Sequence, residues 1–173
     1  ALLGAAAGPA AADDPAPRPA LTPELKVLGR FVGDWTERIE FPGKQVVKGV
    51  GHTRWILRRT YIESIFRVTL PDGQLMQHLS LFTWDPQKKV YRTWLSSPGT
   101  LPMESTAAWD AASGTFSSTS KPDARGMVTI SESRFINGNV IRWTVESRGK
   151  DAKVLFSLKG VDTRVPPKPD AGK

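Results

Sequence analysis

Residues 31 to 164 consist almost wholly of extended segments and turns, and polar and aromatic residues alternate on several of the segments. That two-residue period is typical of β-strands. Turn-forming residues interrupt the segments about every ten residues. These turn signals are Pro42-Gly43, Pro71-Asp72-Gly73, Asp85-Pro86, Pro98-Gly99, Asp110 to Gly114, Pro122 to Gly126, Asn137-Gly138 and Arg148-Gly149. The run from 44 to 70 exceeds the ~10 residues that most strands reach. A break near Ile56 to Arg59 therefore raises the predicted number of strands from nine to ten.

The connections between these strands predict the fold class. Asn137-Gly138 is the strongest hairpin signal in the chain, because this pair favours a type I′ turn. No helical segment separates the strands, so short turns join them into an antiparallel meander, and closure into a barrel removes its exposed edges. The prediction is an all-β fold, a ten-stranded antiparallel up-and-down barrel. Side chains just fill a barrel of ~8 strands, so a wider one is expected to enclose a cavity.

A short helix is predicted before the first strand. Thr22 is a good N-cap residue, and Pro23 suits the first helical position. Leu25, Leu28 and Phe31 then form a narrow apolar stripe on one face. Such a helix would plug one end of the barrel.

The two ends of the chain differ in composition from the predicted domain at 21–164. Residues 1–12 are small and apolar, with an Ala10-x-Ala12 cleavage signal, and resemble the remnant of a secretory signal peptide. Residues 13–20 are Pro-rich and are predicted to be a disordered leader, and residues 165–173 a disordered tail. The predicted location is the periplasm or the outside of a bacterial cell.

Charge and cysteine content limit the partners. The chain has 173 residues, a formal net charge of +7 and no cysteine, which excludes a disulfide framework and a thiol nucleophile. Its basic residues are scattered and match no nucleic-acid-binding motif, so we expect no nucleic-acid partner. At most a weak association with an anionic membrane surface is expected. The apolar stretch at 1–12 is shorter than the ~20 residues of a transmembrane helix. Oligomeric state is not predicted.

Catalytic and metal sites are not predicted. The two histidines, His52 and His78, are far apart in the sequence, and no HxH or HExxH motif occurs, so no metal and no cofactor are expected. The carboxylates show no close pairs on one face of a predicted strand. The Gly49-Val50-Gly51 segment is interpreted as a bulge or a tight bend at a barrel corner.

Six residues on the predicted strands are candidate ligand contacts. Inside a cavity, polar side chains would bind the polar end of an amphiphile and aromatic ones its tail. An outer barrel wall alternates in the same way, so these residues could equally face solvent. The candidates are Trp55, Tyr61, Glu63, His78, Trp94 and Arg142.

Several short motifs resemble a known family. Gly33-Asp34-Trp35 is similar to the start of a lipocalin-like (calycin) barrel. The wider set resembles the bacterial domain of unknown function 1579, which is regarded as lipocalin-like and often secreted. This set is Phe31 to Trp35, Arg54 to Leu57, Trp84-Asp85, Lys88 to Tyr91, Trp94, Trp109-Asp110 and Thr163-Arg164. The chain departs from the family pattern at Arg58-Arg59-Thr60 and at Thr83.

The resemblance also implies a structural role for three residues. In lipocalins the Trp of the Gly-x-Trp motif packs against an Arg of the last strand. Gly33, Trp35 and Arg164 would accordingly close one end of the barrel through a cation–π contact. The function predicted from all of this is binding of a small apolar or amphipathic molecule in the cavity. The alternatives are a cavity-based enzyme of isomerase or hydrolase type, and an envelope protein-interaction module without a ligand.

Overall fold

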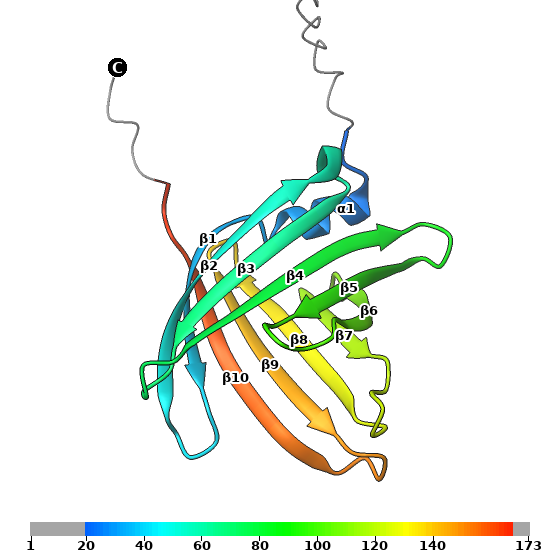
Figure 1. Cartoon of the computed structure of the whole chain (residues 1–173). Coiled ribbons are helices and arrows are strands. Elements are labelled where there is room, and N and C mark those ends of the chain that lie inside the picture. Colours follow the sequence, from blue (N-terminus) through cyan, green and yellow to red (C-terminus); the bar gives the residue numbers. More distant parts are fainter. Residues whose placement is uncertain (1–19, 168–173) are drawn as a thin grey trace, which may run out of the picture.

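The computed structural model describes residues 20–167 and consists of a closed antiparallel barrel of ten strands (Figure 1). A short helix, α1 (Pro23–Gly29), precedes the barrel. The strands are β1 (Gly33–Glu40), β2 (Val46–Ile56), β3 (Tyr61–Thr69), β4 (Leu75–Asp85), β5 (Val90–Ser96), β6 (Met103–Asp110), β7 (Thr115–Ser120), β8 (Val128–Asn137), β9 (Val140–Arg148) and β10 (Val154–Arg164). Each strand pairs with its neighbours in sequence, and β1 also pairs with β10 to close the barrel. The predicted fold class is confirmed.

The local signals produce the expected elements. The Thr22 hydroxyl accepts a hydrogen bond from the Leu25 amide at 3.3 Å and so caps α1. A single 3-10 turn, η1 (Leu57–Arg59), divides the long run at the predicted position. The predicted signal-peptide remnant, nearly all of the leader and residues 168–173 lie outside the described residues.

Helix α1 lies across one end of the barrel (Figure 1), which we call the helix end. Strand β1 starts there, and the opposite end, where the β1–β2 turn lies, is the far end. Alternate burial along β1 leaves Trp35, Glu37 and Ile39 buried, so these side chains point inward. The cross-strand register carries the same alternation around the whole barrel.

Two apolar layers fill the ends of the interior. At the helix end, buried Leu28 and Ile62 pack with aromatic residues, and the ring of Phe31 lies edge-on to Phe116 with centroids 5.4 Å apart. At the far end, Ile39, Val47 and Val68 are buried, and Trp143 and Leu158 among others pack against them. A fully buried large apolar side chain contributes about 1.5–3 kcal/mol to stability. These layers therefore stabilise the barrel at both ends and leave its middle for other residues.

Of the two interpretations of Gly49 to Gly51, a bulge or a tight bend, the bulge is wrong. The β1–β2 and β2–β3 registers continue without a shift through both glycines. The glycines instead leave space for neighbouring side chains, since a Cβ on Gly51 would overlap the ring of Phe66.

Candidate functional site

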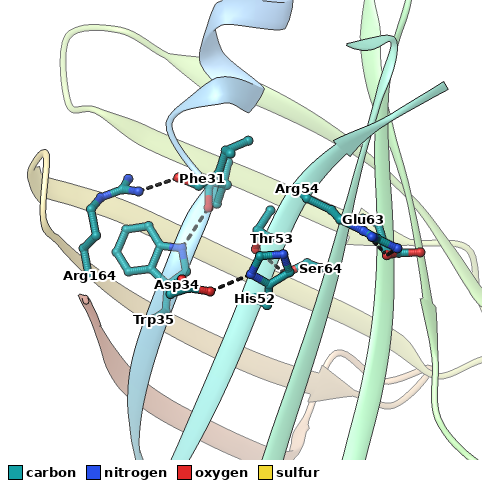
Figure 2. Close-up of polar contacts among 10 residues, drawn as sticks. Phe31, Asp34, Trp35, His52, Thr53, Arg54, Glu63, Ser64 and Arg164 are labelled. Carbon is teal, nitrogen blue, oxygen red and sulfur yellow. Dashed lines mark hydrogen bonds and ion pairs between the residues drawn. The ribbon is translucent and has the colours of Figure 1, made fainter. Parts of the chain in front are cut away.

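The middle of the barrel is lined mainly by small hydroxyl side chains. The inward-facing hydroxyl residues are Thr53, Ser64, Ser80, Thr93, Ser105, Ser118, Ser120, Thr129, Ser131, Ser133 and Ser147. Some of them bond to one another across strands. Thr53 Oγ1 lies 2.7 Å from Ser64 Oγ, and Ser118 Oγ lies 2.7 Å from Ser131 Oγ (Figure 2 shows the first pair). Small side chains leave space, and their hydroxyls can donate and accept hydrogen bonds inside it.

A cavity of about 140 Å³ lies in this part of the barrel. Ten inward-facing residues and Trp94 border it. The ten are Ser80, Phe82, Thr93, Leu95, Met103, Ser105, Ser118, Thr129, Ser131 and Val145. Apolar and hydroxyl side chains thus share one wall, the combination that ligand sites use for burial and for orientation.

A second space lies beside α1 at the helix end. This cleft of about 460 Å³ is bordered by Val27 of the helix and by Trp84 and Trp109 of the barrel, among others. The Tyr91 hydroxyl donates to the carbonyl oxygen of Glu24 at 3.2 Å and so ties the helix to the barrel. Burial, together with the Glu24 carboxylate, raises the pKa of Tyr91 to about 12, so the hydroxyl stays protonated.

A pair of carboxyl groups is buried in the interior between the two apolar layers. Glu37 of β1 and Asp162 of β10 lie directly opposite each other in the register, with exposed fractions of 6% and 8%. The Trp143 indole N–H donates to Asp162 Oδ1 at 2.9 Å. Glu37 extends toward β2, where a Cβ on Gly49 would lie 3.0 Å from its Oε2. Among the described residues, Glu37 Oε2 has no hydrogen-bond partner.

Burial dominates the electrostatics of this pair. It raises the pKa of Glu37 from 4.5 to about 8, and the Asp162 carboxylate adds to the rise. Burial also raises the pKa of Asp162 to about 7, against the opposing effect of the Trp143 hydrogen bond. Near neutral pH the pair therefore retains protons that surface carboxylates have lost.

Two of the six predicted ligand residues point into the barrel. His78 faces inward on β4, with its ring stacked on Phe66 at a centroid distance of 5.5 Å, and burial lowers its pKa. Trp55 faces inward at the helix end, beside Gly29 of α1.

The other four predicted ligand residues lie in outward-facing rows, although Trp94 also borders the cavity of about 140 Å³. Tyr61 stacks on Trp94 across the outer surface, with ring centroids 6.4 Å apart. Glu63 pairs with exposed Arg54 at 2.8 Å (Figure 2). Arg142 lies in the outward row of β9 and borders a surface groove. The alternation of residues does not indicate which face of a strand points into the barrel. The register shows that the row with these four residues points outward.

Trp35 and Arg164 meet at the helix end, opposite each other in the register. The Arg164 guanidinium lies 4.2 Å from the centroid of the Trp35 ring. It donates to the carbonyl oxygens of Val32, Arg30 and Gly138, the last two at 2.8 and 3.0 Å. The Trp35 indole N–H donates to the Phe31 carbonyl at 2.8 Å (Figure 2). These contacts connect the first and last strands to the segment that follows α1.

Residues 20–167 contain neither a candidate metal site nor a helix that could cross a membrane. No group of three or more His, Cys, Asp or Glu residues there could bind a metal ion. In the same part of the chain, none of the helices has the length and apolar character needed to cross a membrane.

Two solved structures share the barrel fold of this chain. Rv2717c from M. tuberculosis matches with a TM-score of 0.62 at 12% identity, over 85% of this chain and 100% of its own. The S-type phycobiliprotein lyase CPES from Guillardia theta matches with a TM-score of 0.57 at 11% identity, over 83% of this chain and 93% of its own. At these identities the likeness shows a shared barrel fold, which agrees with the predicted ten-stranded barrel. No protein-family model matches the chain, and no curated protein matches its sequence. The resemblance to the domain of unknown function 1579 therefore stays a prediction.

Proposed function

We propose that the protein binds a small amphipathic molecule inside its barrel. The observation that carries this proposal is the cavity of about 140 Å³, which has Phe82, Met103 and Val145 on its wall beside hydroxyls such as those of Ser118 and Ser131. The apolar side chains would supply affinity through burial, and the hydroxyls would orient the polar group of the ligand.

The cavity volume indicates the size of the ligand. An apolar cavity of about 150 Å³ is large enough to bind benzene, whereas drug-sized molecules need about 300–1,000 Å³. A single ring or a short chain with one polar group therefore fits the interior as it stands. The wider cleft beside α1 offers a route by which a ligand could approach the barrel.

A matched pair of variants tests this proposal. Ser118 faces the cavity and its neighbour Ser117 faces outward on the same strand. Ser118→Leu fills part of the cavity and is expected to weaken the binding of benzyl alcohol, measured by ligand-observed NMR, at least about tenfold. Ser117→Leu is expected to leave it unchanged. Equal affinities in the two variants, or no saturable binding to the original protein, would contradict the proposal.

The natural ligand can be sought directly. Native mass spectrometry of protein purified without detergent from its own host should show an additional mass that is released on denaturation. The same preparation of Ser118→Leu should carry less of it. An additional mass that is equally abundant in both proteins would place the ligand outside the cavity.

Acid–base catalysis is a second candidate function, favoured by one observation. Glu37 is buried, and its pKa is raised to about 8, which is the range that suits a general base near neutral pH. Deprotonation of 5-nitrobenzisoxazole by the protein is the test. Catalysis should rise as Glu37 loses its proton and disappear in Glu37→Gln, and equal rates in the two proteins would exclude this function for Glu37.

The proposed place of action is the periplasm or the exterior of a bacterial cell. The composition of residues 1–12 supports it, because a short apolar stretch ending in an Ala-x-Ala site is typical of a signal peptide. Fractionation of cells that express the natural gene should recover the protein with periplasmic or extracellular markers. Recovery with cytoplasmic markers would contradict this proposal.

A further inference from the structure

One oxygen of the buried carboxyl pair takes part in no hydrogen bond within the described part of the chain. Glu37 makes no hydrogen bond through Oε2 to any described residue, although only 6% of its surface is exposed. An unpaired buried polar group costs free energy, and the cost is larger for a charged group. The free oxygen of Glu37 is therefore available to accept a hydrogen bond from a ligand that enters the barrel.

The pair is placed by backbone features that give it room. Gly49 of β2 lies opposite Glu37 of β1, and Gly160 of β10 lies opposite Trp143 of β9. A Cβ at either glycine would approach Oε2 of Glu37 or overlap the Trp143 ring, respectively. The absent side chains therefore allow both a carboxyl and an indole to lie inside the barrel.

The pair is also connected to the cavity along β9. Val145 borders the cavity, and Trp143 is the next inward-facing residue on that strand. The Trp143 indole in turn bonds to Asp162, which lies opposite Glu37. The carboxyl of Asp162 therefore lies just beyond Trp143, opposite Ile141 and two inward positions from Val145 along β9.

No basic side chain of the described residues forms an ion pair with Glu37 or Asp162. Within residues 20–167 the remaining inward-facing ionisable residues of the strands are His78, Tyr91 and Arg164. Arg164 lies at the helix end, where it donates to backbone carbonyls, and Tyr91 bonds to the helix. The described ion pairs include neither Glu37 nor Asp162. The positive charge that would favour the ionised form of these carboxyl groups is therefore not supplied by the described part of the chain.

We propose that Glu37 and Asp162 bind the protonated nitrogen of the ligand, so that the molecule held in the barrel is a small cationic amphiphile such as an aromatic or aliphatic amine. This inference rests on the proposed function, since it specifies the chemical class of the ligand in the same barrel. An ammonium group donates several hydrogen bonds and could reach both the free oxygen of Glu37 and the carboxyl of Asp162. The ring of Trp143, which already bonds to Asp162, would also favour a cation.

Three probes that share one ring and differ in charge test the ligand class. Benzylamine is cationic near pH 7, benzyl alcohol is neutral and benzoate is anionic. Their affinities are measured by ligand-observed NMR and calorimetry on the full chain. Benzylamine is expected to bind about tenfold more tightly than benzyl alcohol, because hydrogen bonds to an ionised group are roughly twice as strong as neutral ones. Benzoate should bind most weakly, even though the formal net charge of +7 would favour an anion.

Two variants of the pair and one control assign the preference to these carboxyl groups. Glu37→Gln and Asp162→Asn keep the shape of the side chains, and each is expected to reduce the preference for benzylamine to about twofold or less. Glu132→Gln removes an exposed, outward-facing carboxylate of β8 and should retain the preference.

Each outcome distinguishes this inference from the function on which it rests. If benzyl alcohol or benzoate binds as tightly as benzylamine, the ligand class is wrong and the binding function remains. If the preference for benzylamine persists in both Glu37→Gln and Asp162→Asn, the amine binds elsewhere and the inference is also wrong. If none of the three probes binds to the original protein, both proposals are wrong.

Discussion

Replacing Glu37 by glutamine should make the folded protein more stable, and the gain should grow with pH. Glutamine has the shape of glutamate without its ionisable proton. The carboxyl of Glu37 is buried beside Asp162, and burial raises its pKa from 4.5 to about 8. A stability effect of this sign is unusual, since removal of a buried polar group from a satisfied network destabilises a protein.

The magnitude follows from the two pKa values. Below about pH 4.5 the carboxyl is protonated in both the folded and the unfolded chain, so it does not change the free energy of unfolding with pH. As the pH rises toward 8, the unfolded chain releases the proton while the folded barrel retains it, so folding becomes less favourable. Each pH unit over this interval corresponds to about 1.4 kcal/mol. The folded state therefore loses about 5 kcal/mol by pH 9, a large part of a typical stability of about 5–15 kcal/mol.

Urea unfolding followed by tryptophan fluorescence measures this effect. Near pH 4 the midpoints of Glu37→Gln and the original protein should agree closely. At pH 9 the midpoint of the variant should be higher by about 2.5 M, for a slope of about 2 kcal/mol per molar urea. Glu132→Gln, which changes an exposed carboxylate, should show no comparable dependence on pH. A Glu37→Gln midpoint that is lower than the original at pH 9, or a difference that does not change with pH, would refute the reasoning.

Four further substitutions test the backbone and the barrel closure by the same unfolding assay. Trp35→Leu and Arg164→Gln should show a coupling energy of about 1 kcal/mol in a double-mutant cycle, because the guanidinium lies 4.2 Å from the ring centroid; additive effects would argue against the cation–π contact. Arg58 has a φ of 56°, in the left-handed region, so Arg58→Gly should stabilise the protein by about 1 kcal/mol, and a loss of stability would contradict this. Gly51→Ala should destabilise it by about 1–3 kcal/mol, because the new Cβ overlaps the ring of Phe66, and a neutral effect would show that the ring can move freely.

The fold could be predicted from the sequence because its signals are local. Turn residues such as Asn137-Gly138 lie where the strands end, and Thr22 and Pro23 start the helix in the expected way. Short turns without intervening helices leave an antiparallel meander as the simplest topology. The break at Leu57–Arg59 followed from strand length alone.

The candidate site could be predicted only in part, because the face of a strand is a tertiary property. His78 and Trp55 point inward, whereas Tyr61 and Trp94 have the same kind of alternation and face outward. A shift of one residue exchanges the two faces of a strand. The alternating pattern in the sequence therefore could not distinguish inward-facing from outward-facing residues.

The carboxyl pair was missed because its members lie on the first and last strands. Glu37 and Asp162 become neighbours only when β1 pairs with β10. The sequence did contain a signal, since the pairing of Trp35 with Arg164 expected from the lipocalin resemblance fixes an antiparallel register. In that register, two residues further along β1 and two residues back along β10, Glu37 lies opposite Asp162.

The most direct test of the central claim, that the barrel interior binds a small molecule, is to measure intermolecular NOEs from bound benzyl alcohol to methyl groups of the protein. Met103 and Val145 border the cavity, and Val50 is exposed on the outer face of β2. The account predicts NOEs to the methyl groups of Met103 and Val145 and none to those of Val50. NOEs only to outer-face methyl groups, or none at saturating benzyl alcohol, would contradict it.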